Sequence, residues 1–141
     1  MKAIRVEKNG GPEVLGLRDV PEPQPAAGQV RIRVHAAGVN PVETYIRAGQ
    51  QGYGGPLPYT PGGDAAGVID AVGADVSGVK VGDRVFTSRA FTGSYAEKAL
   101  ANASEVYPLP EHVTFQAGAA IGIPWAPTRA RWAERCCRCM R

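Results

Sequence analysis

Cysteine is absent from the first 125 residues, and the chain's three cysteines lie close together at Cys136, Cys137 and Cys139. A secreted disulfide framework needs cysteines spread through the fold, so none is expected. No apolar run approaches the ~20 residues that a membrane helix requires, and the N-terminus MKAIRVEKNG has no apolar signal core. These absences favour a soluble cytoplasmic protein without membrane contact.

A net positive charge is also lacking outside the C-terminal end. Residues 126–141 carry five Arg and one Glu, a net charge of +4, whereas the whole chain has a net charge of +3. The first 125 residues therefore sum to −1, and they lack the basic, aromatic-interleaved face of a nucleic-acid binder. Any contact with RNA or another acidic partner is expected from the Arg-rich tail.

What the chain has in quantity is Gly (18) and Pro (12), within 141 residues that are 44% hydrophobic. A chain of this length fits one domain, and many turn residues among Val, Ile and Tyr favour short strands with tight turns. Residues 3–6 and 14–17 read as a hairpin around Asn-Gly-Gly-Pro. Further strands are expected at 30–36, 64–76 and 84–87, and two more within 94–110. The fold class is mainly β (α+β), a partly open β-barrel with short helices.

The strand QVRIRVHAAG alternates strictly, which places Val30 and Ile32 on the buried side and His35 on the opposite side. We therefore interpret His35 as a solvated or hydrogen-bonded surface residue rather than a ligand.

One short helix is predicted where this strand gives way to GVNPVETYIRAG. Asn40 is suited to the N-cap, Pro41 to the first turn, Glu43 to a capping box and Gly49 to a left-handed stop. Taken as a cap alone, Asn40 should tolerate replacement by Asp, because Asp caps equally well. A second helix is predicted to begin at Thr114.

The segment between residues 47 and 63 is so rich in Gly and Pro that we expect an irregular loop, and long loops in compact domains are often functional. It carries Tyr53 and Tyr59, which are weak candidates for a substrate cleft. Packing of Tyr59 against Pro58 and Pro61 is an equally good interpretation.

A family resemblance is carried by four segments in order: AIRVEKNGGPEVLGLRDVP, GQVRIRVHAAGVNPVETYIRAG, LPYTPGGDAAGVIDAVGADVSGVKVGDRVF and GSYAEKALANASEVYPLPEHVTFQAGAAIGIP. Together they resemble the N-terminal half of the zeta-crystallin quinone oxidoreductases, in the medium-chain dehydrogenase/reductase superfamily. The resemblance implies that residues 1–125 form a GroES-like substrate-side domain. In that family, the domain packs against a Rossmann domain, with NADPH and a quinone in the cleft between them.

The resemblance also suggests roles for particular residues. In zinc-using relatives a cysteine ligand matches Asn40 and a His-Glu pair matches Gly63-Asp64, so no metal is expected here. In zinc-free relatives the residues that match Asn40 and Tyr45 lie by the nicotinamide end of the cofactor. We therefore predict that Asn40 and Tyr45 bind cofactor, with core filling as the alternative for Tyr45. No residue is identified as catalytic.

The resemblance ends at Trp125. No glycine turn of the G-x-G-x-x-G type occurs in the chain, so the Rossmann domain is expected to be absent and residues 126–141 to be an unrelated, disordered, basic Cys-rich tail. We interpret the chain as a truncated isoform that by itself is inactive, and monomeric or prone to aggregate. The alternative is a non-catalytic interaction module whose Arg-rich tail binds RNA or an acidic partner.

Overall fold

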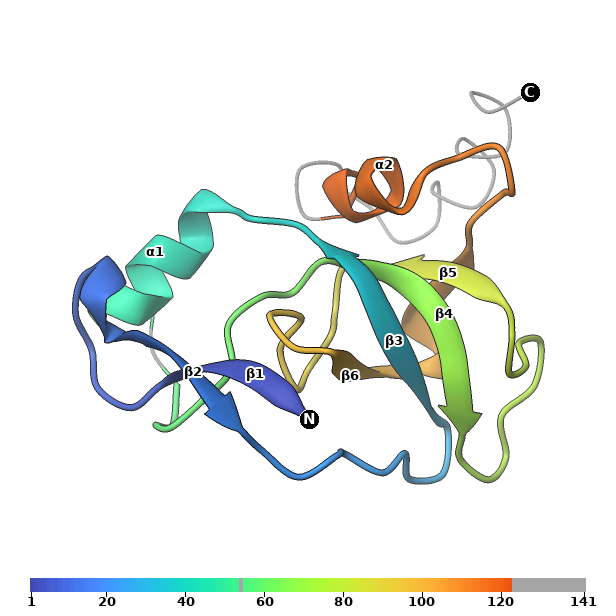
Figure 1. Cartoon of the computed structure of the whole chain (residues 1–141), viewed down its shortest axis with the longest axis horizontal. Coiled ribbons are helices and arrows are strands. Elements are labelled where there is room, and N and C mark those ends of the chain that lie inside the picture. The colour runs from blue at the N-terminus through green and yellow to red at the C-terminus, as the bar shows by residue number, and fades with distance from the viewer. Residues whose placement is uncertain (54, 123–141) are drawn as a thin grey trace.

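A computed structural model describes residues 1–53 and 55–122, and its elements are drawn in Figure 1. The strands are β1 (Lys2–Val6), β2 (Leu15–Asp19), β3 (Gln29–Ala37), β4 (Ala65–Val72), β5 (Arg84–Thr87), β6 (Lys98–Asn102) and β7 (Val106–Pro108). The helices are α1 (Pro41–Ala48) and α2 (Phe115–Ala120), with 3-10 turns at Pro12–Val14 and Ala103–Glu105. The described part is mainly β, as predicted.

Five of the strands form one curled antiparallel sheet in the order β6-β3-β4-β5-β7, and β1 and β2 form a separate hairpin. Single bridges join β1 to the rest of the fold, from Ala3 to Ala96 and from Val6 to Tyr59. Figure 1 shows the curvature of the large sheet, with α2 above it and α1 beyond one end. This arrangement confirms the predicted partly open barrel.

Two predicted boundaries need correction. Val14 belongs to the 3-10 turn, and β2 begins only at Leu15, because Pro12 starts a helical turn before the chain extends. The strand predicted over 64–76 ends at Val72. After it, Gly73 donates its N–H to the Gln29 carbonyl and Asp75 adopts a left-handed φ of 59°, so the chain turns there.

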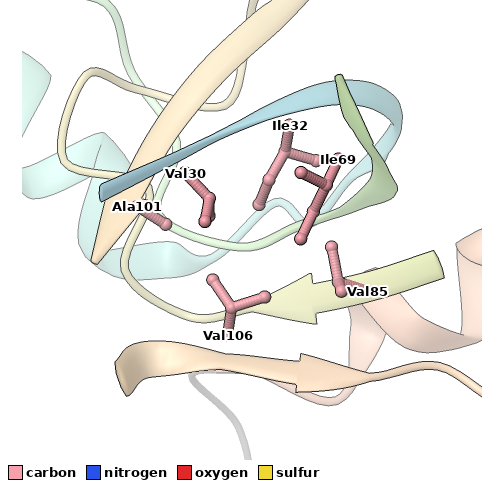
Figure 2. Close-up of a cluster of buried hydrophobic side chains, with 6 residues drawn as sticks. All are labelled: Val30, Ile32, Ile69, Val85, Ala101 and Val106. Atoms are coloured by element: carbon pink, nitrogen blue, oxygen red, sulfur yellow. The ribbon is translucent and has the colours of Figure 1, made fainter. Parts of the chain in front are cut away.

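The alternation predicted for β3 positions the main core. Val30 and Ile32 point inward and pack with four buried residues from the neighbouring strands: Ile69, Val85, Ala101 and Val106. Figure 2 shows these six side chains converging between the strands of the curled sheet. Burial of such a set is the main stabilising contribution to a domain of this size.

The opposite side of β3 is partly covered by α2. His35 is exposed, as predicted, but its ring stacks on Phe115 with the ring centroids 4.5 Å apart. The Arg84 guanidinium carbon also lies 4.3 Å from the centre of the Phe115 ring. The predicted start, Thr114, is the N-cap of this helix, and its hydroxyl accepts a hydrogen bond of 3.1 Å from the Ala117 N–H.

No helix within the described residues is long and apolar enough to span a membrane. The tail at residues 126–141, with its three cysteines, lies outside the described residues. The disorder of this tail and its contact with RNA therefore stay predictions. The cytoplasmic location of the protein also stays a prediction.

Candidate functional site

Helix α1 forms as the sequence predicts. Asn40 is the N-cap with extended backbone angles, and the Glu43 carboxylate accepts a hydrogen bond of 3.2 Å from the Asn40 backbone N–H. At the other end Gly49 takes a left-handed φ of 69° and donates its N–H to the Ile46 carbonyl. The local sequence thus fixes where the helix begins and ends.

The Asn40 side chain has a partner that capping does not predict. It is 5% exposed, and its Nδ2 donates a hydrogen bond of 2.9 Å to Oδ2 of Asp64, which is 1% exposed. Asp64 directly precedes β4, so the bond ties the start of α1 to the start of a central strand. A Cβ on Gly38 or on Gly122 would overlap Asp64, so these two glycines enclose the carboxylate. The Asn40 amide is therefore held inside the fold.

This pair does not suit a metal ion. Zinc sites use sulfur, imidazole and carboxylate donors, and the Asn40 amide nitrogen is already donating to the carboxylate. Within residues 1–53 and 55–122 no three His, Cys, Asp or Glu side chains gather as metal ligands would. The residues at this place therefore do not fit a catalytic zinc.

Glu43 joins three separate segments of the chain. Its carboxylate accepts hydrogen bonds from the Asn40 N–H, from the Gly63 N–H at 3.4 Å, and from the Tyr95 hydroxyl. Burial raises the pKa of Tyr95 well above its ordinary value, and the hydrogen bond to Glu43 and its negative charge raise it further. The phenol therefore stays protonated and donates to Glu43 throughout the neutral range.

Tyr45 on α1 and Tyr53 in the loop after it lie together on the surface. Their ring centroids are 5.5 Å apart with an interplanar angle of 55°, and the residues are 39% and 43% exposed. Tyr45 therefore does not fill the core. The pair offers aromatic faces to solvent, and such faces stack readily on a planar ring.

Tyr59 is not part of this exposed pair. Its backbone exchanges hydrogen bonds with Val6 at 2.9 and 3.1 Å, and its hydroxyl is buried without a hydrogen-bond partner among the described residues. Burial raises the pKa of the Tyr59 phenol. Tyr59 thus serves at least to join the loop before β4 to β1.

The contacts that connect the candidate residues are not predictable from the sequence. The sequence indicates Glu43 only as a capping residue and Asp64 only as part of the pair that matches a zinc-ligand position, and it gives no signal for Tyr95. The Glu43–Tyr95 contact joins residues 52 positions apart, and no local pattern carries that information.

Comparison with known proteins identifies the family of the fold. The alcohol dehydrogenase GroES-like domain family matches residues 26–111. A quinone oxidoreductase from Homo sapiens is 60% identical over 126 residues, which are 89% of this chain and 38% of the relative. The chain therefore spans less than two fifths of the length of this relative.

Two solved structures share the fold. A mycobacterial protein solved in complex with NADPH is 41% identical, with a TM-score of 0.79 over 84% of this chain and 37% of that one. The Escherichia coli quinone oxidoreductase, also in complex with NADPH, is 33% identical, with a TM-score of 0.79 over 84% of this chain and 36% of that one. The chain belongs to the alcohol dehydrogenase GroES-like domain family, and its predicted resemblance to the zeta-crystallin quinone oxidoreductases is confirmed.

Proposed function

We propose that this chain supplies the quinone-side wall of the active site of a zinc-independent, NADPH-dependent quinone reductase. The observation that carries the proposal is the exposed pair of Tyr45, on a helix whose start is fixed by hydrogen bonds, and Tyr53. The names of the most similar relatives and the NADPH in two related structures support the same substrate and cofactor.

NADPH, when bound, supplies the hydride that reduces the quinone. The role of this chain is to hold the acceptor ring. An aromatic face at Tyr45 or Tyr53 stacks on the planar quinone, and a phenol hydroxyl can donate a hydrogen bond to a quinone oxygen as negative charge develops there. Such positioning is a large part of the rate in reactions between two bound reactants.

Asn40 contributes from beneath this surface. Its amide is committed to Asp64, so we assign it the placement of the α1 N-terminus at the cofactor end of the cleft. With Asn40 and Gly63 in place of metal ligands, the proposed reaction proceeds without zinc.

The test is quinone binding by the purified chain. We would titrate it with 9,10-phenanthrenequinone and follow tyrosine fluorescence, in a background with Cys136, Cys137 and Cys139 changed to Ser to avoid thiol oxidation. Tyr45→Leu and Tyr53→Leu should each weaken binding by roughly 2- to 10-fold, since an aromatic pair contributes about 0.5–1.5 kcal/mol beyond its buried area.

Phe91→Leu is the matched control, because Phe91 is a 52% exposed aromatic residue outside the site. It should leave the affinity unchanged. The proposal would be refuted if the chain with Tyr45 and Tyr53 intact showed no saturable quinone binding. It would also be refuted if all three variants lost the same amount of quinone affinity.

A further inference from the structure

Helix α1 has no fully buried residue, and its apolar side chains Val42 and Ile46 are only half-buried. Contacts at its two ends add to this limited packing. At the C-terminal end, the Arg47 carbonyl accepts a hydrogen bond of 3.0 Å from the Gly10 N–H, and Arg47 Nε donates to the Gly10 carbonyl at 3.3 Å. These bonds secure the helix to the turn of the β1–β2 hairpin, beside which it lies in Figure 1.

The N-terminal end is secured by the Asn40–Asp64 hydrogen bond and also through Glu43. One carboxylate there accepts hydrogen bonds from the helix cap, from Gly63 in the loop before β4, and from Tyr95 in the segment before β6. Hydrogen bonds to an ionised carboxylate are stronger than those between neutral groups. A helix without a fully buried residue should therefore shift measurably when one of these bonds is removed.

The backbone of Tyr95 is held in place by hydrogen bonds. The Tyr95 carbonyl accepts a hydrogen bond of 2.8 Å from the Ile4 N–H, and the Tyr95 N–H donates one of 3.0 Å to the Pro61 carbonyl. Strand β1 and the loop before β4 thus hold Tyr95 from both sides. Motion of the Glu43–Tyr95 pair is consequently motion of α1 rather than of Tyr95.

We propose that Glu43 and Tyr95 form a positioning pair that sets where Asn40 and Tyr45 lie at the quinone-side wall. The placement of α1 is inferred from the hydrogen bonds of Glu43. The effect of that placement on quinone binding rests on the proposed function. Neither residue needs to touch the quinone. Their effect on binding passes through α1.

The first test needs no ligand. In ¹H–¹⁵N and aromatic NMR spectra of the whole chain, Tyr95→Phe should shift the Asn40 side-chain amide signals and the Tyr45 ring signals. Tyr107→Phe is the matched control, since it removes a phenol hydroxyl from a half-buried tyrosine on β7 whose ring packs against Phe86 on β5. Unchanged Asn40 and Tyr45 signals in folded Tyr95→Phe would overturn the inference.

A second pair of variants separates positioning from simple loss of stability. Glu43→Gln keeps one acceptor oxygen, whereas Glu43→Ala keeps none, so the NMR shifts at Tyr45 should be smaller in Glu43→Gln. Equal shifts in both variants, at equal folded fractions, would count against the inference. Tyr95→Phe keeps the test decisive if Glu43→Ala does not fold.

The last experiment measures whether the Glu43–Tyr95 pair affects quinone binding. With 9,10-phenanthrenequinone as the probe, in the same cysteine-free background, Tyr95→Phe should raise the Kd about 5- to 10-fold, the loss expected for one hydrogen bond. Tyr107→Phe should not change it. Quinone binding by the parent with an unaltered Kd in Tyr95→Phe would overturn the inference. If the parent chain binds no quinone, the proposed function is wrong. The NMR shifts would still show whether Glu43 and Tyr95 set the position of α1.

Discussion

At the level of single residues, the hydrogen bond between the Asn40 amide and Asp64 changes what a substitution at position 40 should cost. Capping alone predicts that Asp is as good as Asn. In the structure, however, the amide nitrogen faces a carboxylate in a buried place, at 2.9 Å. An Asp at position 40 would set two carboxylates against each other, and these repel unless one of them binds a proton.

We therefore predict that Asn40→Asp is destabilising and that its cost depends on pH. The loss should be roughly 2–4 kcal/mol at pH 8, as for other buried charges without a partner. A folded pair that retains a proton binds more protons than the unfolded chain does, so the stability of the variant should fall as pH rises. Urea unfolding at pH 5 and pH 8, relative to the parent at each pH, measures both effects.

Asn9→Asp, at an exposed position, is the control and should show no such pH dependence. If Asn40→Asp were as stable as the parent at pH 8, the buried contact with Asp64 would contribute little free energy. Helix capping alone would then explain the contribution of Asn40 to stability.

The residue scale also shows what the sequence could and could not predict. The cap at Asn40, the partner at Glu43 and the stop at Gly49 lie within ten positions of one another, and all three occupy the predicted places. Tyr95 and Asp64 approach α1 only after the sheet has formed. Their contacts depend on topology, which no local pattern encodes.

At the level of elements, ion pairs among four charged side chains hold the Pro-rich connector before β3 against the sheet. Arg31 on β3 pairs with Asp70 on β4 at 2.7 Å and with Glu22 of the connector at 3.4 Å. Lys98 on β6 pairs with Glu22 at 2.8 Å and with Asp70 at 3.3 Å. Networks of this kind contribute more than isolated surface pairs.

The pKa shifts of these acids give the direction of the pH dependence. Burial raises the pKa of Asp70, but hydrogen bonds from Arg31 and Lys98 outweigh it, and the pKa is lowered overall. The hydrogen bond from Lys98 likewise lowers the pKa of Glu22. A carboxyl with a lowered pKa in the folded state adds stability above its unfolded pKa of about 4, and that stability is lost as pH falls through the folded value.

We therefore predict that Asp70→Asn lowers the Tm by a few degrees at pH 7 and that this difference narrows as pH falls below about 4. Thermal unfolding followed by circular dichroism at pH 7, 5 and 3.5 would measure it. Asp75→Asn is the matched control, because Asp75 is exposed and its left-handed φ of 59° is one that Asn tolerates. A constant difference at all three pH values would exclude an ionic contribution from Asp70.

Element placement was more predictable than contacts between elements. Alternation located β3, and turn residues located β5, with Gly82 at a left-handed φ of 94° just before it. The stacking of His35 on Phe115 could not be predicted in this way, because period-two alternation gives a side of the sheet and not the helix that returns over it.

At the scale of the whole molecule, histidine and cysteine donors for zinc are few, and the two histidines belong to different parts of the fold. The chain has two histidines and three cysteines. His35 stacks on Phe115, His112 lies in the turn before α2, and the cysteines all lie beyond residue 135. A tetrahedral site needs three or four such donors around one point, and the described residues hold no such group.

We therefore predict that the chain with Cys136, Cys137 and Cys139 changed to Ser retains no stoichiometric zinc after incubation with Zn²⁺ and dialysis. Elemental analysis measures the metal directly. The parent chain is the control: zinc found there and lost with the cysteines would belong to the tail. One equivalent of zinc retained by the cysteine-free variant would require donors from the folded domain, with Asp64 the first candidate. The Asn40–Asp64 hydrogen bond would then have to open to admit the ion, and the assignment of this domain to a zinc-independent reductase would fail.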